Sequence, residues 1–220
     1  LALVTAGPRP LPGHLIAQLA AACPVQRKLV LTSASAAEFA PCGSLDTLDA
    51  LHRLNGLEAT YDLIVYITDG EPTPWSRKVI RQSDEILLIG YQDDNPVGQP
   101  VALNALEHFV LGLERRPALR LVLVHPRRSE AQGTRHWLAG RDVRMHHHVA
   151  EGSAEDVGRL WRFMRGEALG LVACGGGAYC AAHIGVYKAF KEAGVGFDMI
   201  GGTSGGAAME AAFAQDLDAD

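Results

Sequence analysis

Short apolar runs alternate with longer amphipathic segments over the first 165 residues, and this alternation constrains the fold more than any other feature. The runs are rich in Val, Ile and Leu and occupy residues 1–5, 28–31, 63–67, 85–90 and 119–124. Several lack the polar alternation of a half-exposed strand, which is typical of parallel strands covered on both faces. We expect helices between and after them, at residues 15–22, 45–54, 75–82, 102–113, 130–139 and 154–165. This order predicts an α/β protein with a doubly wound parallel sheet.

The composition excludes several classes of protein. The 220 residues are 48% hydrophobic, which suffices for one large domain or two small ones. The net charge is −5 and no basic patch stands out beyond the arginine pairs 115–116 and 127–128, so no nucleic-acid partner is expected. The four cysteines lack the spacing of a metal site or a disulfide framework, and no signal peptide opens the chain. We therefore expect reduced thiols and a cytoplasmic location.

Residues 168–187 contain no Asp, Glu, Lys or Arg and are long enough to suggest a membrane span. Five glycines and His183 within the segment argue against a span and favour a strand, a turn and a helix. Any contact with a membrane should therefore be peripheral.

The loop at residues 7–14 follows the first expected strand, where a phosphate-binding loop would stand. Such a loop needs a lysine followed by serine or threonine at the helix start, but His14 and Leu15 occupy those places. Three prolines in the loop also remove N–H donors. A structural turn is favoured over nucleotide binding.

Three consecutive histidines, His146 to His148, raise the question of a metal site. Neighbouring residues of a strand point to opposite faces, so the three rings cannot easily chelate one ion. We favour a strand near a domain edge and predict no metal site.

A G-x-S-x-G sequence runs from Gly202 to Gly206 and directly follows the apolar run 197–201. A serine in this setting, here Ser204, is held on a sharp turn between strand and helix with its hydroxyl exposed. Glycines flank it because the strained backbone leaves no room for a neighbouring Cβ. The pattern indicates a nucleophile elbow, and the alternative is a simple turn of small residues.

A glycine triplet, Gly175, Gly176 and Gly177, directly follows another apolar run at residues 169–174. Successive backbone N–H groups near a helix start suit a developing oxyanion. The segment is only a weak match to a dinucleotide fingerprint, because Cys180 takes the place of its third glycine. The triplet and the elbow together indicate a serine hydrolase.

The two glycine segments, with the residues around them, resemble the start of a patatin-like phospholipase domain, in the variety found in bacterial relatives of neuropathy target esterase. The linker domain that lies between cyclic-nucleotide-binding and patatin domains in those proteins resembles residues 75–77, 81–88, 121–126 and 146–149 of this chain. The resemblance implies an α/β linker or regulatory domain at residues 1–166 and the N-terminal, incomplete part of a patatin domain at residues 167–220. It also implies a cyclic-nucleotide-binding domain upstream in the full-length protein.

The resemblance implies that Ser204 is the nucleophile of a Ser–Asp dyad and that Gly175, Gly176 and Gly177 form the oxyanion hole. The substrate would be a phospholipid or lysophospholipid acyl ester, hydrolysed through an acyl-serine without a metal or organic cofactor. No catalytic histidine is implied, so we expect His183 to be structural. The dyad aspartate has no match in this chain, because Asp69-Gly70 lies upstream in the other domain. We expect the 220-residue chain alone to be almost inactive.

Two residues depart from the family pattern. Tyr179 and Cys180 stand where the family has Arg or Lys followed by Gly. Because that cation and glycine shape the oxyanion loop, the departures favour an alternative interpretation. In it, the chain is a non-catalytic regulatory or interaction module with a degenerate hydrolase start.

Overall fold

The computed structural model describes residues 1–39, 45, 47–94, 98–115, 117–126 and 132–215, which form two compact units. The first unit covers residues 1–158 and the second covers residues 159–220. The strands of the first unit are β1 (Ala2–Thr5), β2 (Lys28–Leu31), β3 (Leu63–Ile67), β4 (Glu85–Tyr91), β5 (Ala118–His125) and β6 (Met145–Ala150). Its helices are α1 (Gly13–Ala22), α2 (Ser33–Phe39), α3 (Leu48–Thr60), α4 (Pro74–Gln82), α5 (Ala105–Leu111) and α6 (Thr134–Leu138), with a 3₁₀ turn, η1 (Gln92–Asp94). Helix α7 (Ala154–Arg165) crosses the division between the units.

The six strands form one parallel sheet in the order β2-β3-β1-β4-β5-β6. The chain runs outward from β1 to β2, returns through β3, and crosses to the other side of β1 to form β4. The strand order therefore reverses between β1 and β4, and ligands of open α/β sheets bind outside the carboxyl ends of the strands at such a point. The expected doubly wound parallel sheet is confirmed.

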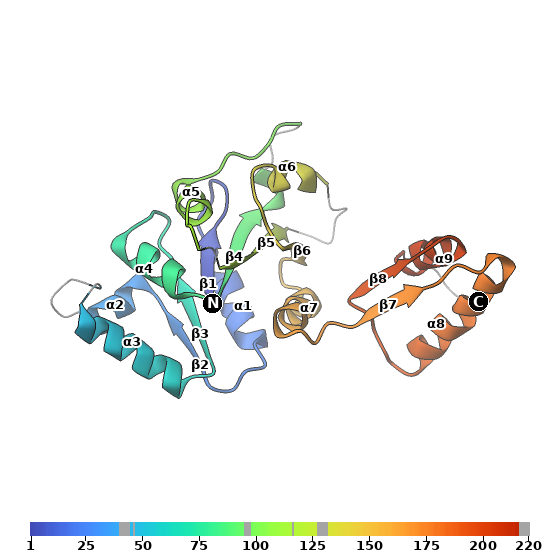
Figure 1. Ribbon diagram of the computed structural model, residues 1–220, viewed down its shortest axis with the longest axis horizontal. Coiled ribbons are helices and arrows are strands. Elements are labelled where there is room, and N and C mark those ends of the chain that lie inside the picture. The colour runs from blue at the N-terminus through green and yellow to red at the C-terminus, as the bar shows by residue number, and fades with distance from the viewer. Residues whose placement is uncertain (40–44, 46, 95–97, 116, 127–131, 216–220) are drawn as a thin grey trace. The chain divides into compact units, whose positions relative to one another are not determined.

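Alternate residues of each strand face opposite sides of the sheet, and both sides are buried. One face carries Val4, Tyr66, Leu88 and Leu121, which pack in one core with residues of α3, α4, α5 and α6. Strand residues of the opposite parity, such as Leu3 and Leu87, are also buried. Helix α1, which buries Leu15 and Leu19, lies on the other side of the sheet from α3 and α4 (Figure 1).

The observed elements follow the sequence expectations with several differences. The helix expected at residues 102–113 is the shorter α5, which begins after the Asn104 cap. Helix α3 begins at Leu48 and not at residue 45, because the Thr47 hydroxyl accepts a hydrogen bond from the Ala50 N–H and caps the helix. Helix α6 begins at Thr134, after Gly133 with a left-handed φ of 76°, and part of the segment expected to precede it lies outside the described residues. Helix α2 was not expected, since its Ser- and Ala-rich sequence has no apolar stripe.

The triple histidine lies in β6, the edge strand of the sheet next to β5. His146 is exposed and His147 is buried, as the alternation of a strand requires. Within the described ranges, no group of three or more His, Cys, Asp or Glu side chains could hold a metal ion.

The second unit is a short α/β arrangement. A two-stranded parallel sheet pairs β7 (Gly170–Ala173) with β8 (Met199–Gly202), followed in each case by helical structure. After β7 come a 3₁₀ turn, η2 (Gly177–Ala181), and α8 (Ala182–Glu192), and after β8 comes α9 (Gly205–Phe213). No helix in the described part of the chain is both long enough and apolar enough to cross a membrane.

Candidate active site

Ser204 occupies a strained turn between β8 and α9. Its φ of 53° and ψ of −128° make it the only residue other than glycine with a positive φ among those described. L-residues avoid this region, and such strain persists where the surrounding structure imposes it, often at functional sites. The Ser204 carbonyl accepts the Ala207 N–H at 3.0 Å, so the turn leads directly into α9. The expected strand, tight turn and helix start are confirmed.

The two flanking glycines of the elbow are required by close contacts. A Cβ added to Gly206 would lie 2.4 Å from the Ala173 carbonyl oxygen and 2.5 Å from that of Cys174. A Cβ on Gly202 would lie 2.7 Å from the Gly206 carbonyl carbon. Real Cβ contacts are longer than this, so only glycine lets α9 start this close to the end of β7.

The glycine triplet lies beside the serine. A Cβ on Gly175 would lie 2.9 Å from the Ser204 Cβ and 3.5 Å from its hydroxyl oxygen. Within the part of the chain that the structure describes, the N–H groups of Gly175 and Gly176 donate to no protein acceptor. Gly177, with a left-handed φ of 57°, starts the 3₁₀ turn that continues into α8. The loop therefore combines free donors with a helix start, which is favourable for an anion.

The two residues that depart from the family pattern occupy different environments. Tyr179 is 89% exposed, so its ring does not pack into the loop. Cys180 is buried, and its Sγ lies only 2.7 Å from the position that a Cβ on Gly205 would take. The Cys180 side chain therefore packs against the first residue of α9, next to the elbow.

His183 contacts the backbone at Cys174, directly before the glycine triplet, and not the serine. Its Nε2 lies 2.9 Å from the Cys174 carbonyl oxygen and must donate, because a carbonyl only accepts. Among the described residues, no His, Asp or Glu side chain forms a hydrogen bond with the Ser204 hydroxyl. This placement agrees with a structural role for His183, which stays a prediction.

A buried carboxylate on α9 was missed by the sequence reasoning. Glu210 is 3% exposed, and neither carboxylate oxygen has a hydrogen-bond partner. Burial raises the pKa of Glu210, and the nearby His183 partly opposes that shift. The only signal in the sequence is a lone acidic residue in a helix otherwise made of Gly, Ala, Met and Phe.

Asp198 anchors the start of β8. Its carboxylate accepts hydrogen bonds from Arg162 Nε at 2.9 Å and from the Leu169 N–H at 3.1 Å. The hydrogen bond from Arg162 is the main reason why the pKa of Asp198 lies below its usual value. Asp198 thus ties α7 to the segments that enter β7 and β8.

Asp69, the one aspartate in the sequence that is followed by glycine, is part of the cap of α4. Its carboxylate accepts the Thr73 hydroxyl at 2.5 Å, and its N–H donates to the Ser76 hydroxyl at 3.0 Å. Asp69 belongs to the first unit, and these contacts give it a structural task there.

Comparison with known proteins identifies the class of each part. The family model described as "Neuropathy Target Esterase family P-loop like domain" matches residues 14–162. The model described as "Patatin-like phospholipase" matches residues 171–220, which include the elbow and the whole glycine triplet. A parallel-sheet domain followed by a patatin-like segment is therefore the class of protein that the fold and the site define.

The chain belongs to the neuropathy target esterase family. "Lysophospholipase nte1" of Neosartorya fischeri is 34% identical over an alignment 218 residues long, and the match covers 75% of this chain and 14% of that protein. "Patatin-like phospholipase domain-containing protein 7" of Mus musculus is 32% identical over 202 residues, covering 77% of this chain and 15% of that protein. "Neuropathy target esterase sws" of Drosophila willistoni is 33% identical over 177 residues, covering 68% and 12%. The chain thus spans a small part of these relatives, and no solved structure matches it.

Proposed function

We propose that this chain carries the nucleophile and the oxyanion loop of a patatin-type serine hydrolase that cleaves acyl esters of phospholipids or lysophospholipids. The observation that carries the proposal is the left-handed backbone of Ser204 beside the glycine loop. The Ser204 Cβ lies 2.9 Å from the position that a Cβ on Gly175 would take. A strained serine beside unpaired N–H donors is the arrangement that acyl transfer requires.

In the proposed reaction, the Ser204 oxygen attacks the ester carbonyl as a base takes the hydroxyl proton. The Oγ–C bond forms, and the negative oxygen of the tetrahedral intermediate accepts hydrogen bonds from the N–H groups of the loop at Gly175 to Gly177. The bond to the leaving alcohol then breaks, and the alcohol takes up the proton. Water attacks the acyl-serine in the second half, releasing the fatty acid and restoring the hydroxyl.

The base in this family is an aspartate, and none of the carboxylates described above bonds to the serine. A serine hydroxyl is a weak nucleophile without a base. We therefore propose that the 220-residue chain by itself is almost inactive. A longer chain that includes the family's Asp-Gly motif would hydrolyse lysophospholipids.

The second candidate is a non-catalytic regulatory or interaction module. The exposed Tyr179 ring and the buried Cys180 side chain favour it, because they replace the cation and the glycine of the family pattern. In this case the elbow would persist as structure while the loop failed to stabilise an oxyanion.

The wider setting of the protein is also proposed from its relatives. A lipid substrate requires contact with a membrane or a micelle, and a peripheral contact suits a chain without a spanning helix in its described part. A cyclic-nucleotide-binding domain upstream in the full-length protein is proposed on the resemblance of the linker domain.

A serine-directed fluorophosphonate probe tests the proposal. The longer chain should be labelled at Ser204 and should hydrolyse lysophosphatidylcholine, and Ser204→Ala should abolish both. Ser33→Ala, which makes the same chemical change at an exposed position of α2, is the matched control and should leave both unchanged. An inert longer chain that recovers activity with Tyr179→Arg and Cys180→Gly would support the regulatory candidate. Undiminished hydrolysis by Ser204→Ala would refute the mechanism.

A further inference from the structure

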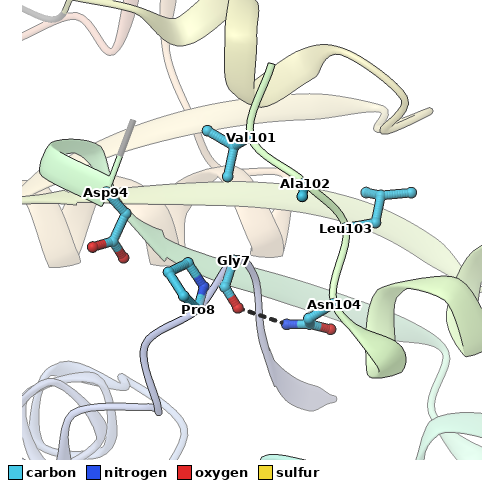
Figure 2. Close-up of a pocket in the computed structure, with 7 residues that line it drawn as sticks. All are labelled: Gly7, Pro8, Asp94, Val101, Ala102, Leu103 and Asn104. Carbon is cyan, nitrogen blue, oxygen red and sulfur yellow. Dashed lines mark hydrogen bonds between the residues drawn. The ribbon is translucent and has the colours of Figure 1, made fainter. Parts of the chain in front are cut away.

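The first unit contains a cavity of about 320 Å³ at the point where the strand order reverses. Three segments line it: the loop after β1, the turn after β4 and the stretch that leads into α5 (Figure 2). Its lining residues are Gly7, Pro8, Asp94, Val101, Ala102, Leu103 and Asn104. The volume is in the range of small-molecule sites, and the position is where ligands of open α/β sheets bind.

Asp94 brings an unpaired charge to this mostly apolar cavity. Its side chain is only 7% exposed, and its Oδ1 accepts the Arg9 Nε at 2.6 Å. Its Oδ2 is buried and has no hydrogen-bond partner. Burial raises the pKa of Asp94, and Arg9 opposes that shift. A buried carboxylate with Arg9 as its partner at only one oxygen is costly, and a cation held near it in the cavity would offset that cost.

The local charge favours a cation. Arg9 also pairs with Asp93, at 2.9 Å from Nη2 to Oδ2, so one guanidinium serves two carboxylates. The group of three side chains keeps a net charge of −1 when both carboxylates are ionised. A bound ammonium would balance it.

The same place is closed to phosphate. The Gly7 N–H donates to the Glu107 carboxylate at 3.1 Å, and the Asn104 side-chain amide donates to the carbonyls of Thr5 and Gly7. Pro8 and the two further prolines of the loop have no N–H. The part of the loop that lines the cavity, Gly7 and Pro8, therefore offers a phosphate no free N–H donor.

Glu107 itself is held by a buried pair that fixes the back of the loop. Arg141 Nη2 donates to Glu107 Oε2 at 3.0 Å, and both side chains are fully buried. The Trp137 ring packs so closely on Gly7 that a Cβ there would lie 2.8 Å from it. The site is therefore preformed rather than assembled by the ligand.

We propose that this cavity binds a small organic ammonium ion with an apolar body, whose ammonium group pairs with the Asp94 carboxylate in the cavity wall. Val101, Ala102 and Leu103 would contact the apolar body. In this proposal the first unit is a ligand-binding domain for a cation, although the family model that matches it is described as P-loop like.

The test uses the 220-residue chain and three probes of one shape: phenethylammonium, 2-phenylethanol and 3-phenylpropionate, with ADP as a fourth. Binding is measured by calorimetry and by methyl chemical shifts of Val101 and Leu103. The cation should bind about ten times more tightly than the alcohol, the difference expected of a charge-assisted hydrogen bond. The carboxylate and ADP should not shift these methyl signals.

Asp94→Asn should reduce the affinity for the cation about tenfold and leave that for the alcohol nearly unchanged. Asp93→Asn is the matched control, because Asp93 shares Arg9 but is half exposed and does not line the cavity. Ala102→Phe, at an exposed position of the lining, should block both neutral and cationic probes without unfolding the domain. Equal affinities of the cation for the wild type and Asp94→Asn would overturn the proposal. So would tighter binding of the anionic probes, or no binding of the cation at 10 mM, a concentration about tenfold above a weak Kd of 1 mM.

Discussion

At the scale of single residues, the second unit depends on positions where no atom can be added. Gly206 lies against two backbone carbonyls at the end of β7, whereas Gly201, five residues earlier in β8, has open space where a Cβ would stand. The G-x-S-x-G pattern includes Gly206 and not Gly201, and the structure shows the contacts that make the difference. The elbow is thus specified by a close approach of backbone to backbone, whose exact partners the sequence does not reveal.

Gly206→Ala should destabilise the second unit, because its Cβ would lie 2.4 Å from the Ala173 carbonyl oxygen. We expect a loss of about 1–3 kcal/mol, as for overpacking elsewhere. Hydrogen exchange of the β7 and α9 amides measures the loss where it occurs. Gly201→Ala, the control, should change exchange little. Equal effects of the two substitutions would contradict the close approach.

A second residue-scale prediction concerns His125 in the first unit. Its ring is buried, its Nε2 lies 2.6 Å from His148 Nδ1, and burial lowers its pKa from the usual 6.5, with Asp156 opposing. The unfolded chain therefore binds the proton more readily than the folded one. The contribution of the neutral His125 ring to folding stability is fully present above pH 6.5 and decreases as the pH drops below that value.

Urea unfolding of the chain at pH 7.5 and pH 5.5 measures this dependence. The wild type should lose more unfolding free energy between the two values than His125→Gln does. His52→Gln, which removes a histidine from an exposed position of α3, should keep the wild-type dependence. A steeper loss in His125→Gln than in the wild type would show that the sign is wrong.

At the scale of elements, the strands were predictable and several element boundaries were not. The run 63–67 became β3 without change, because burial on both faces requires unbroken apolar sequence. The run 28–31 became the edge strand β2, in which only Leu31 is buried. Helix α2 lacks such a stripe, and the start of α3 depends on the Thr47 cap. Glu210 and the cavity at Asp94 escaped prediction for another reason. They arise from contacts between segments distant in sequence, on which local patterns carry no information.

Asp198→Ala should loosen the entry into β7 and β8. The substitution removes the Arg162 contact and leaves the Leu169 N–H without its acceptor. Because the Arg162 side chain is 44% exposed, we expect a loss of about 1–2 kcal/mol rather than the larger cost of a buried pair. Denaturation at neutral pH measures it, and Glu167→Ala, which removes an exposed partner of Arg165, is the control.

The lowered pKa of Asp198 predicts that its contribution to stability depends on pH. Its pKa is lower in the folded chain than the ordinary 3.8, so its contribution is present above that value and disappears as the pH falls through the folded pKa. The difference in stability between the wild type and Asp198→Ala should therefore shrink when the pH is lowered from 7 to below 3.8. If this difference in stability stayed constant over the range, the ion pair of Asp198 could not be its source.

At the scale of the whole molecule, the boundary between the two compact units lies close in sequence to the gap between the two family matches. The compact units divide between Gly158 and Arg159, while the family matches end at residue 162 and resume at residue 171. The segment between the two matches, residues 163–170, contains the end of α7 and then Gly166, which has a left-handed φ of 71°. We propose a domain boundary at about residue 166, where a helix has ended and the next strand has not begun.

Limited proteolysis tests this boundary. Exposed segments with few backbone hydrogen bonds are cut first, and Arg165 and Gly166 are both exposed. Trypsin at low concentration should therefore cleave first after Arg165, giving fragments of residues 1–165 and 166–220 that mass spectrometry identifies. Arg165→Gln should delay this cut, whereas Arg27→Gln, at an exposed position in the first unit that pairs with Asp62, should not. Subtilisin, which does not need a basic residue, should also cut near Gly166 before it cuts within β3 (Leu63–Ile67), whose residues are mostly buried. Early cleavage inside β3 would contradict the domain assignment, because a strand in the interior of the sheet is reached only after the first unit unfolds.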